Sequence, residues 1–274
     1  MSPEGIHIEL FSSGYCTGNT RHVFPDEPSG VVPFNATWAF IDHPFLGKML
    51  FDTGYSMRFY ESTRLFPNRL YRWITPVFHK SEESCANQLL RLKIIPEDIR
   101  NIVMSHFHAD HAGGLKDFPQ AAIWCSQEAL SYVNGKNLFP SVFKGLLKFL
   151  IPDDISDRAV FPEEELEESE MSGLTLWKWH DDIYFVNLPG HFRGQLGLYL
   201  KGTNCGDLLL CADAAWSFKA IRQKTYPSKL VSLISDDYPE LTKTIDKLHH
   251  LHITHPNINI LPTHCHETMN LVRR

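Results

Sequence analysis

One stretch of the sequence reads Ser105-His106-Phe107-His108-Ala109-Asp110-His111-Ala112-Gly113-Gly114, which places four potential metal ligands within six positions. The residues just before it, N-I-V-M-S at 101–105, predict a short buried strand that ends at His106. His106 and His108 are two residues apart, so their side chains share one side of an extended chain. Asp110 and His111 follow where the chain turns, and can point elsewhere. Imidazole nitrogens and a carboxylate suit Zn²⁺, Mn²⁺, Fe²⁺ or Co²⁺.

Four ligands on one short loop cannot all reach one tetrahedral ion comfortably, so the pattern predicts two half-sites that are completed from elsewhere. The best candidates stand at strand ends before turns. His191 follows L-P-G, Asp213 follows the apolar run 208–212, and His264 follows I-L-P-T. His266 lies two residues after His264 and is the alternative for the last ligand.

Strand-like and helix-like segments alternate along the chain, which is typical of one α/β domain of packed layers spanning residues 1–274. We expect helices at 81–93, 126–133 and 238–251, and strands at 6–11, 37–41, 48–51, 101–105, 121–125, 174–179, 183–187, 195–200, 207–211 and 258–261. Residues 134–170 break this rhythm. We expect a helical insert there, with an amphipathic helix over 137–151 and a solvated acidic connector at 162–168.

The composition excludes several classes of protein. The 274 residues include 26 Lys and Arg against 32 Asp and Glu, a net charge of −6 that argues against a general nucleic-acid binder. We see no basic and apolar leader at the start and no apolar run near the ~20 residues of a spanning helix, so we expect a cytoplasmic protein with no membrane partner. Six cysteines without a C-x-x-C pair indicate reduced, packed thiols.

Taken in order, these motifs give the chain a resemblance to the metallo-beta-lactamase superfamily of hydrolases, over roughly residues 6–266. The motifs are Asp52 in F-D-T-G, the H-x-H-x-D-H block, His191 in L-P-G-H, Asp213 in C-A-D and His264 in L-P-T-H. The segment D-A-A-W and the strand, helix and terminal His after it resemble the N-acyl homoserine lactonases most. The resemblance implies a four-layer αβ/βα sandwich with a two-metal site along one edge.

The resemblance also implies a role for each side chain. His106, His108 and His191 would bind the first metal, Asp110, His111 and His264 the second, and Asp213 would bridge the two. Two divalent ions are implied, with zinc favoured over Mn, Fe or Co. A hydroxide between them would attack a carbonyl, and Asp110 would receive its proton. We interpret Asp52 as the acceptor that orients a ligating histidine.

Two departures from the lactonase pattern bear on the substrate. Trp216 stands three residues after the bridging Asp213, where the lactonases typically carry a Tyr that orients the substrate carbonyl. An indole donates one hydrogen bond and accepts none, so Trp216 would either contact substrate beside the catalytic Asp110 or reshape the pocket for a different ester. Gln195 replaces a second His of the turn after Gly190. The aromatic residues of 55–78 would form an apolar wall for an acyl chain, or belong to the core.

The leading hypothesis is a metal-dependent hydrolase of lactones or related carboxylic esters, with N-acyl homoserine lactones, the signals destroyed in quorum quenching, as first candidates. The alternatives are phosphodiester or thioester hydrolysis at the same kind of site, or a weakly catalytic ligand-sensing member. The expected partner is a small-molecule lactone or ester, with no nucleic acid. A segment at 138–151 could complete the substrate wall or form a homodimer interface, and the sequence leaves both open.

Overall fold

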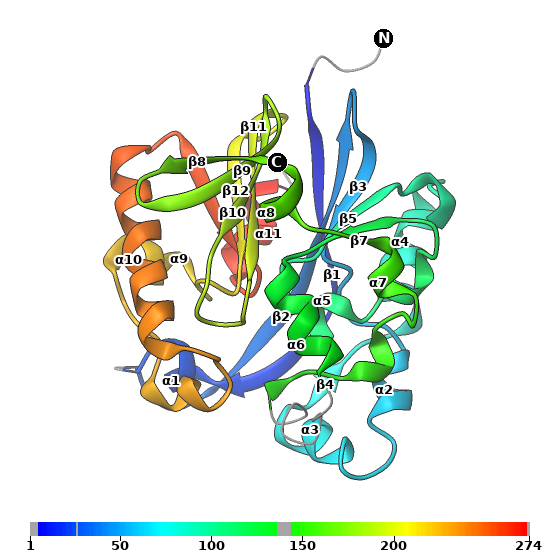
Figure 1. Ribbon diagram of the computed structural model, residues 1–274. Helices are drawn as coiled ribbons and strands as arrows, with labels where there is room; N and C mark the ends of the chain where they lie inside the picture. Colours follow the sequence, from blue (N-terminus) through cyan, green and yellow to red (C-terminus); the bar gives the residue numbers. More distant parts are fainter. Residues whose placement is uncertain (1–4, 26, 136–143, 273–274) are drawn as a thin grey trace.

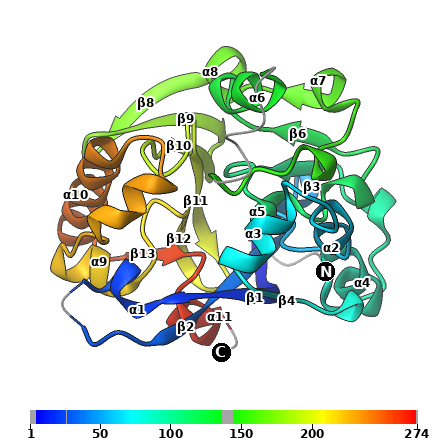
Figure 2. The same cartoon turned by 90° about the horizontal axis from the view of Figure 1, so that it is seen from below.

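Two β-sheets stack face to face, and helices cover both outer faces of the stack (Figure 1). The computed structural model describes residues 5–25, 27–135 and 144–272. Helices α9 (Phe218–Gln223) and α10 (Tyr238–Thr254) lie on the opposite side of the molecule from α2 (Arg58–Ser62) and α4 (Cys85–Arg91), as both views show (Figure 2). The predicted four-layer αβ/βα sandwich is confirmed.

The first sheet has seven strands in the order β4-β1-β2-β3-β5-β6-β7. Their bounds are β1 His7–Asn19, β2 Val31–His43, β3 Gly47–Phe51, β4 Val77–Phe78, β5 Asn101–Val103, β6 Ala122–Trp124 and β7 Ala159–Val160. The strands β3, β5, β6 and β7 run parallel, while β1 and β2 form a long antiparallel pair. Because β5 is a central parallel strand, the chain that leaves its carboxyl end emerges at the edge of the sheet, where His106 follows.

The second sheet has six strands in the order β13-β12-β11-β10-β9-β8. Their bounds are β8 Glu167–Met171, β9 Leu174–His180, β10 Ile183–Asn187, β11 Leu196–Thr203, β12 Gly206–Ala212 and β13 Ile258–Pro262. The strands β12 and β13 pair in parallel, with Leu210 opposite Leu261. Their carboxyl ends therefore leave the sheet side by side, which brings Asp213 and His264 together although 50 residues separate them in the chain.

Alternate residues of the central strands enter different layers of the core. On β12, Leu208 and Leu210 pack between the sheets, while Leu209 packs against the outer helices. On β2, Ile41 faces the other sheet and Phe40 faces the helices of its own side. Strands buried on both faces need apolar residues at nearly every position, which explains the continuous apolar runs in the sequence.

The helices begin and end where local sequence signals place them. The Ser126 side chain accepts from the Ala129 amide at the start of α6 (Gln127–Asn134), the cap that the sequence predicts. Asp237 caps α10, which buries Leu241, Ile245 and Leu248 at helical spacing. The remaining helices are short: α1 Thr20–Val23, α3 Arg69–Ile74, α5 Ala109–Ala112, α7 Ile155–Arg158, α8 Pro162–Glu165 and α11 His266–Val272. No helix among the described residues is long and apolar enough to cross a membrane.

The insert at 134–170 differs from the expected helical one. Residues 136–143 lie outside the described residues, and the described part of the predicted helix over 137–151 forms no α-helix and has a 3₁₀ turn at Lys148–Leu150. The glutamates of the acidic run 162–168 are mostly exposed, as expected, but the run is not a connector: it forms α8 and begins β8, which pairs with β9. Charged residues such as Glu167 and Glu170 keep the exposed edge strand β8 from pairing further.

His43, at the end of β2, links the two sheets. Its buried Nδ1 accepts from the amides of Phe45 and Leu46, so its Nε2 carries the proton and donates to Asp182 at 3.0 Å. Asp182 lies in the turn between β9 and β10 and also contacts His180. Partial burial would raise the pKa of Asp182, but the hydrogen bonds from the two histidines lower it.

We predict that Asp182→Asn lowers the free energy of unfolding at pH 7 by about 1 kcal/mol, since the charged acceptor is lost. A depressed carboxyl pKa gives stability that is present above the unfolded pKa and is lost as pH falls through the folded pKa. The deficit of the variant, measured by urea unfolding, should therefore shrink as the pH drops below about 4. Asp181→Asn removes the exposed neighbour in the same turn and should have a smaller effect. A deficit of D182N that does not change with pH would contradict the prediction.

Candidate metal centre

Loops at the carboxyl ends of strands from both sheets meet at one edge of the sandwich, and they carry all seven predicted ligands. His106 and His108 follow β5, and the helix α5 carries Asp110 and His111. The other three come from the second sheet, His191 after β10, Asp213 after β12 and His264 after β13. Each of these residues is buried, with at most 8% of the residue surface exposed. His266 instead lies at the exposed start of α11, so the structure places His264 in the site.

The first cluster contains three imidazoles and one carboxylate. The Nδ1 atom of His108 lies 3.0 Å from Nε2 of His106 and 3.1 Å from Nε2 of His191. Asp213 approaches the same group, with Oδ2 3.3 Å from Nε2 of His191. The four side chains each offer a donor atom within 4.8 Å of the others, which is close enough to hold one metal ion.

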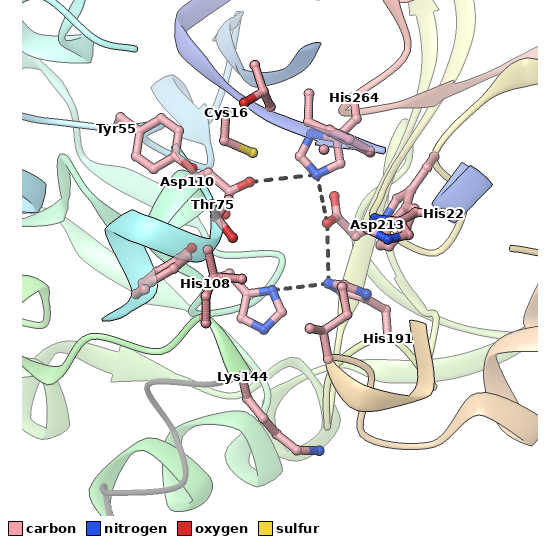
Figure 3. A pocket seen from close by; sticks show the side chains of 18 residues that line it. Cys16, His22, Tyr55, Thr75, His108, Asp110, Lys144, His191, Asp213 and His264 are labelled. Atoms are coloured by element: carbon pink, nitrogen blue, oxygen red, sulfur yellow. Dashed lines mark hydrogen bonds and ion pairs between the residues drawn. The ribbon is translucent and has the colours of Figure 1, made fainter. Parts of the chain in front are cut away.

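The second cluster contains Asp110, His111 and His264, again with donor atoms within 4.8 Å of one another. Oδ2 of Asp110 lies 3.7 Å from Nε2 of His111 and 3.6 Å from Nε2 of His264. Asp213 lies between the two clusters. Its Oδ2 is 2.9 Å from Nε2 of His264 (Figure 3), and its Oδ1 is 3.3 Å from Nε2 of His111. One carboxylate thus faces both groups of imidazoles.

Asp52 orients His111 by a direct hydrogen bond and reaches His106 through Ser105, in agreement with the role that the sequence predicts. Its Oδ2 accepts from Nδ1 of His111 at 2.7 Å, which leaves Nε2 of that ring with a free lone pair toward the cluster. The amide and hydroxyl of Ser105 also donate to Asp52, and the hydroxyl lies 3.0 Å from Nδ1 of His106. The main-chain oxygen of Asn35 orients His264 in the same way, because Nδ1 of His264 donates to it at 2.9 Å.

Burial and mutual charge set the protonation of the site. Burial lowers the pKa of each histidine in the first cluster, to about 3 for His191, so these rings are neutral near pH 7, the form that can bind a metal ion. Burial would also lower the pKa of His111 and His264, but the nearby carboxylates of Asp110 and Asp213 raise both. Burial would raise the pKa of Asp213, but the histidines around it lower that pKa well below its usual value.

The residues present fit divalent metal ions. Nε2 of His111 and Oδ1 of Asp213 are buried without a hydrogen-bond partner among the described residues, although they face each other. Two buried polar atoms that face each other at 3.3 Å without a good hydrogen bond are unfavourable, and a divalent cation that displaces the ring proton of His111 would accept a lone pair from both. A second group, His43, His180 and Asp182, is also close enough to hold an ion. Both nitrogens of His43 are already engaged there, so that group does not fit.

A family model described as the metallo-beta-lactamase superfamily matches residues 32–184, which is more than half of the chain. The chain belongs to the metallo-beta-lactamase superfamily. Membership of this superfamily, together with its lactonase relatives, makes the protein a metal-dependent hydrolase.

Three of the most similar known proteins bear names or titles that mention an N-acyl homoserine or its lactonase. An N-acyl homoserine lactonase AttM from Agrobacterium fabrum is 24% identical over 243 residues, 84% of either chain. Its counterpart from Rhizobium radiobacter is 26% identical over 168 residues, 58% of this chain and 57% of that protein. A structure of B. thuringiensis AiiA with N-decanoyl-L-homoserine at its active site has a TM-score of 0.75, 18% identity and coverage of 98% and 96% of the two chains. At that identity the structural match shows the shared fold.

A cavity of about 230 Å³ opens beside the two clusters of this metallo-beta-lactamase fold. It is lined by Cys16, Thr17, Gly18, His22, Phe34, Tyr55, Tyr71, Ile74, Thr75, His108, Asp110, Lys144, Gly145, His191, Asp213, Trp216, Ile234 and His264. Trp216 packs edge-on to His191, and its indole N–H is buried without a partner among the described residues. Gln195 is buried and is not among the lining residues.

The predicted aromatic wall is present only in part. Tyr55 and Tyr71 line the cavity and pack on Phe59, which belongs to the core, whereas Phe66 and Trp73 are exposed. Sequence reasoning missed Phe34 on β2, whose ring packs edge-on to both Trp216 and His264. No local signal marks Phe34, because it reaches the site through the long pairing of β1 with β2.

Gly145 packs against the imidazole ring of His108. Its carbonyl accepts from the Ala109 amide, it has φ +78°, and a Cβ there would lie 3.2 Å from Cδ2 of His108. We predict that Gly145→Ala displaces His108 and weakens metal binding about 10-fold, the usual cost of disturbing a ligand's support. Gly206→Ala is the matched control, since Gly206 has φ +82° and open space around it. Metal content after dialysis against a weak chelator measures the effect. Equal retention by the two variants would contradict the prediction.

Proposed function

We propose that this protein hydrolyses lactones and related carboxylic esters with two divalent metal ions, zinc being the metal expected, and that N-acyl homoserine lactones are its leading substrates. The proposal rests on one observation: two clusters of buried imidazoles share Asp213 and face an apolar cavity. The relatives named N-acyl homoserine lactonase support the choice of substrate, and one of them aligns over 84% of this chain.

In this proposal the first ion is held by His106, His108 and His191, and the second by Asp110, His111 and His264, with Asp213 between them. When bound, two such ions supply a nucleophile derived from water near neutral pH and polarise the ester carbonyl. Asp110 accepts the proton of the attacking water and returns it to the departing alkoxide, so that a lactone and water become one hydroxy acid. The indole N–H of Trp216, beside His191, has no partner among the described residues, and in this proposal it donates to the substrate.

The lining of the cavity favours an ester over a phosphodiester. Apart from its histidines, Lys144 is the one cationic residue among the described lining residues. Its Nζ lies 2.8 Å from Oδ1 of Asp236 and also donates to the carbonyl of Ser235. A phosphodiester backbone would find no free lysine or arginine there, whereas side chains such as Phe34, Ile74 and Ile234 suit an acyl chain.

The direct test uses purified protein of known metal content. It is assayed against N-hexanoyl homoserine lactone, an aryl ester, a thioester and a phosphodiester, with and without a chelator. We expect lactone hydrolysis that the chelator abolishes. Turnover of the phosphodiester or the thioester alone would overturn the proposed substrate class.

Adjacent histidines give a matched test of the ligand assignment. We predict that His264→Ala, like His108→Ala and Asp213→Ala, lowers the metal content and reduces hydrolysis by at least about 100-fold, because a direct ligand is lost. His266→Ala removes an exposed ring two residues away and should keep both. Metal per chain is measured by emission spectrometry together with the rate of lactone opening. A fully active and metal-loaded H264A variant would refute the assignment.

A further inference from the structure

Tyr55 is held rigidly against the turn that carries Asp110 and His111. The loop that contains it leaves β3 at Asp52 and is bound to that turn at both ends. The Thr53 amide and hydroxyl donate to the His111 carbonyl at 2.8 Å, and the Ser56 hydroxyl donates to the Gly113 carbonyl at 2.6 Å. A Cβ at Gly113 would lie 2.6 Å from the carbonyl oxygen of Gly54, so the two backbones touch. The phenol therefore has a fixed place relative to Asp110.

The hydroxyl of Tyr55 has no hydrogen-bond partner among the described residues, although the side chain is completely buried. Its ring packs edge-on to Phe59, and the residue lines the cavity beside Asp110 and Cys16 (Figure 3). The thiol of Cys16 and the phenol of Tyr71 are its polar neighbours, and neither forms a hydrogen bond of good geometry with it. A buried hydroxyl that is left unpaired is unfavourable, and at a cavity wall it is a donor that awaits a ligand.

We propose that the Tyr55 hydroxyl donates a hydrogen bond to the ester oxygen that departs when the substrate is cleaved. This inference rests on the proposed hydrolysis of esters. The departing oxygen gains negative charge as its bond to the carbonyl carbon breaks, and it must end beside the carboxyl group that returns the proton. Tyr55 lies next to that group, Asp110, while Trp216 offers its N–H on the other side, near His191.

The position of the phenol matters because the Tyr55 hydroxyl is already held beside Asp110 before the reaction begins. A fixed donor aimed at developing charge stabilises the transition state without the cost of reorganising solvent. The benefit is greatest when the leaving group is a strongly basic alkoxide, as in a lactone or an alkyl ester. It is small for an aryl ester, since the ring already delocalises the charge of the departing phenolate.

The experiment compares wild type with Tyr55→Phe, which keeps the ring and its packing on Phe59. The substrates are N-hexanoyl homoserine lactone, ethyl hexanoate and 4-nitrophenyl hexanoate. We expect kcat for the lactone and the ethyl ester to fall about 10- to 100-fold, and kcat for the nitrophenyl ester to fall less than about 3-fold. Metal content should stay as in wild type, because Tyr55 belongs to neither cluster.

Tyr60→Phe is the matched control. Its hydroxyl donates to the Val77 carbonyl and accepts from the His79 amide, and Tyr60 packs in the same core without lining the cavity. It should lower the melting temperature and leave the ratio of alkyl-ester to aryl-ester rates unchanged.

Three results would overturn the inference. The first is an equal fall for all three substrates in Y55F, which indicates a structural effect or a role at the carbonyl oxygen. The second is unchanged lactone hydrolysis in Y55F, which removes the role of Tyr55 and leaves the proposed function standing. The third is a metal-loaded wild-type protein that hydrolyses none of the esters, which removes both.

Discussion

A single buried carboxylate, that of Asp213, lies between two groups of imidazoles, and the site depends on it. Its two oxygens come within 3.3 Å of ring nitrogens of His111, His191 and His264. The histidines lower the pKa of this carboxyl group, and the carboxylates raise the pKa of His111 and His264 in return. Burying the carboxylates and imidazole nitrogens costs free energy, because they lose their contact with water. An opposite charge among them offsets that cost. A divalent cation on each side of Asp213 would supply that charge, which links the folding of the site to metal binding.

The fold meets this constraint by ending strands of both sheets at one edge. Parallel pairing sets β12 beside β13, and β5 is central in the first sheet, so the turns after these strands meet. Local packing then fixes each turn. Gly190, with φ +123°, shows this for His191: a Cβ there would lie 2.2 Å from the Leu241 amide, so only glycine lets α10 approach so closely. Asp52 does the same for His111 through a hydrogen bond, and Gly145 does so for His108 through a contact. The support around the ligands is as specific as the ligands themselves.

The sequence predicts which side chains gather at this edge, because His106, His191, Asp213 and His264 each come soon after an apolar run typical of a buried strand. The resemblance to the superfamily supplies the four layers. His264 and His266 could not be separated by sequence, since both follow β13, and it is the start of α11 that turns His266 to solvent. The strand β8 was missed because its glutamates show no apolar alternation. The predicted helix over 81–93 is broken at Ser84 into a 3₁₀ turn and α4. The substrate cavity was the least predictable part, since Phe34 and Ile234 reach it from distant elements and Tyr55 brings a polar group to an expected apolar wall.

A crystal structure of the zinc-loaded protein, with anomalous diffraction recorded at the zinc edge, would show whether two metal ions share Asp213. We expect two anomalous peaks, one among His106, His108 and His191 and the other among Asp110, His111 and His264, each within bonding distance of an oxygen of Asp213. A single peak, or peaks at other side chains such as His43 and Asp182, would contradict this expectation.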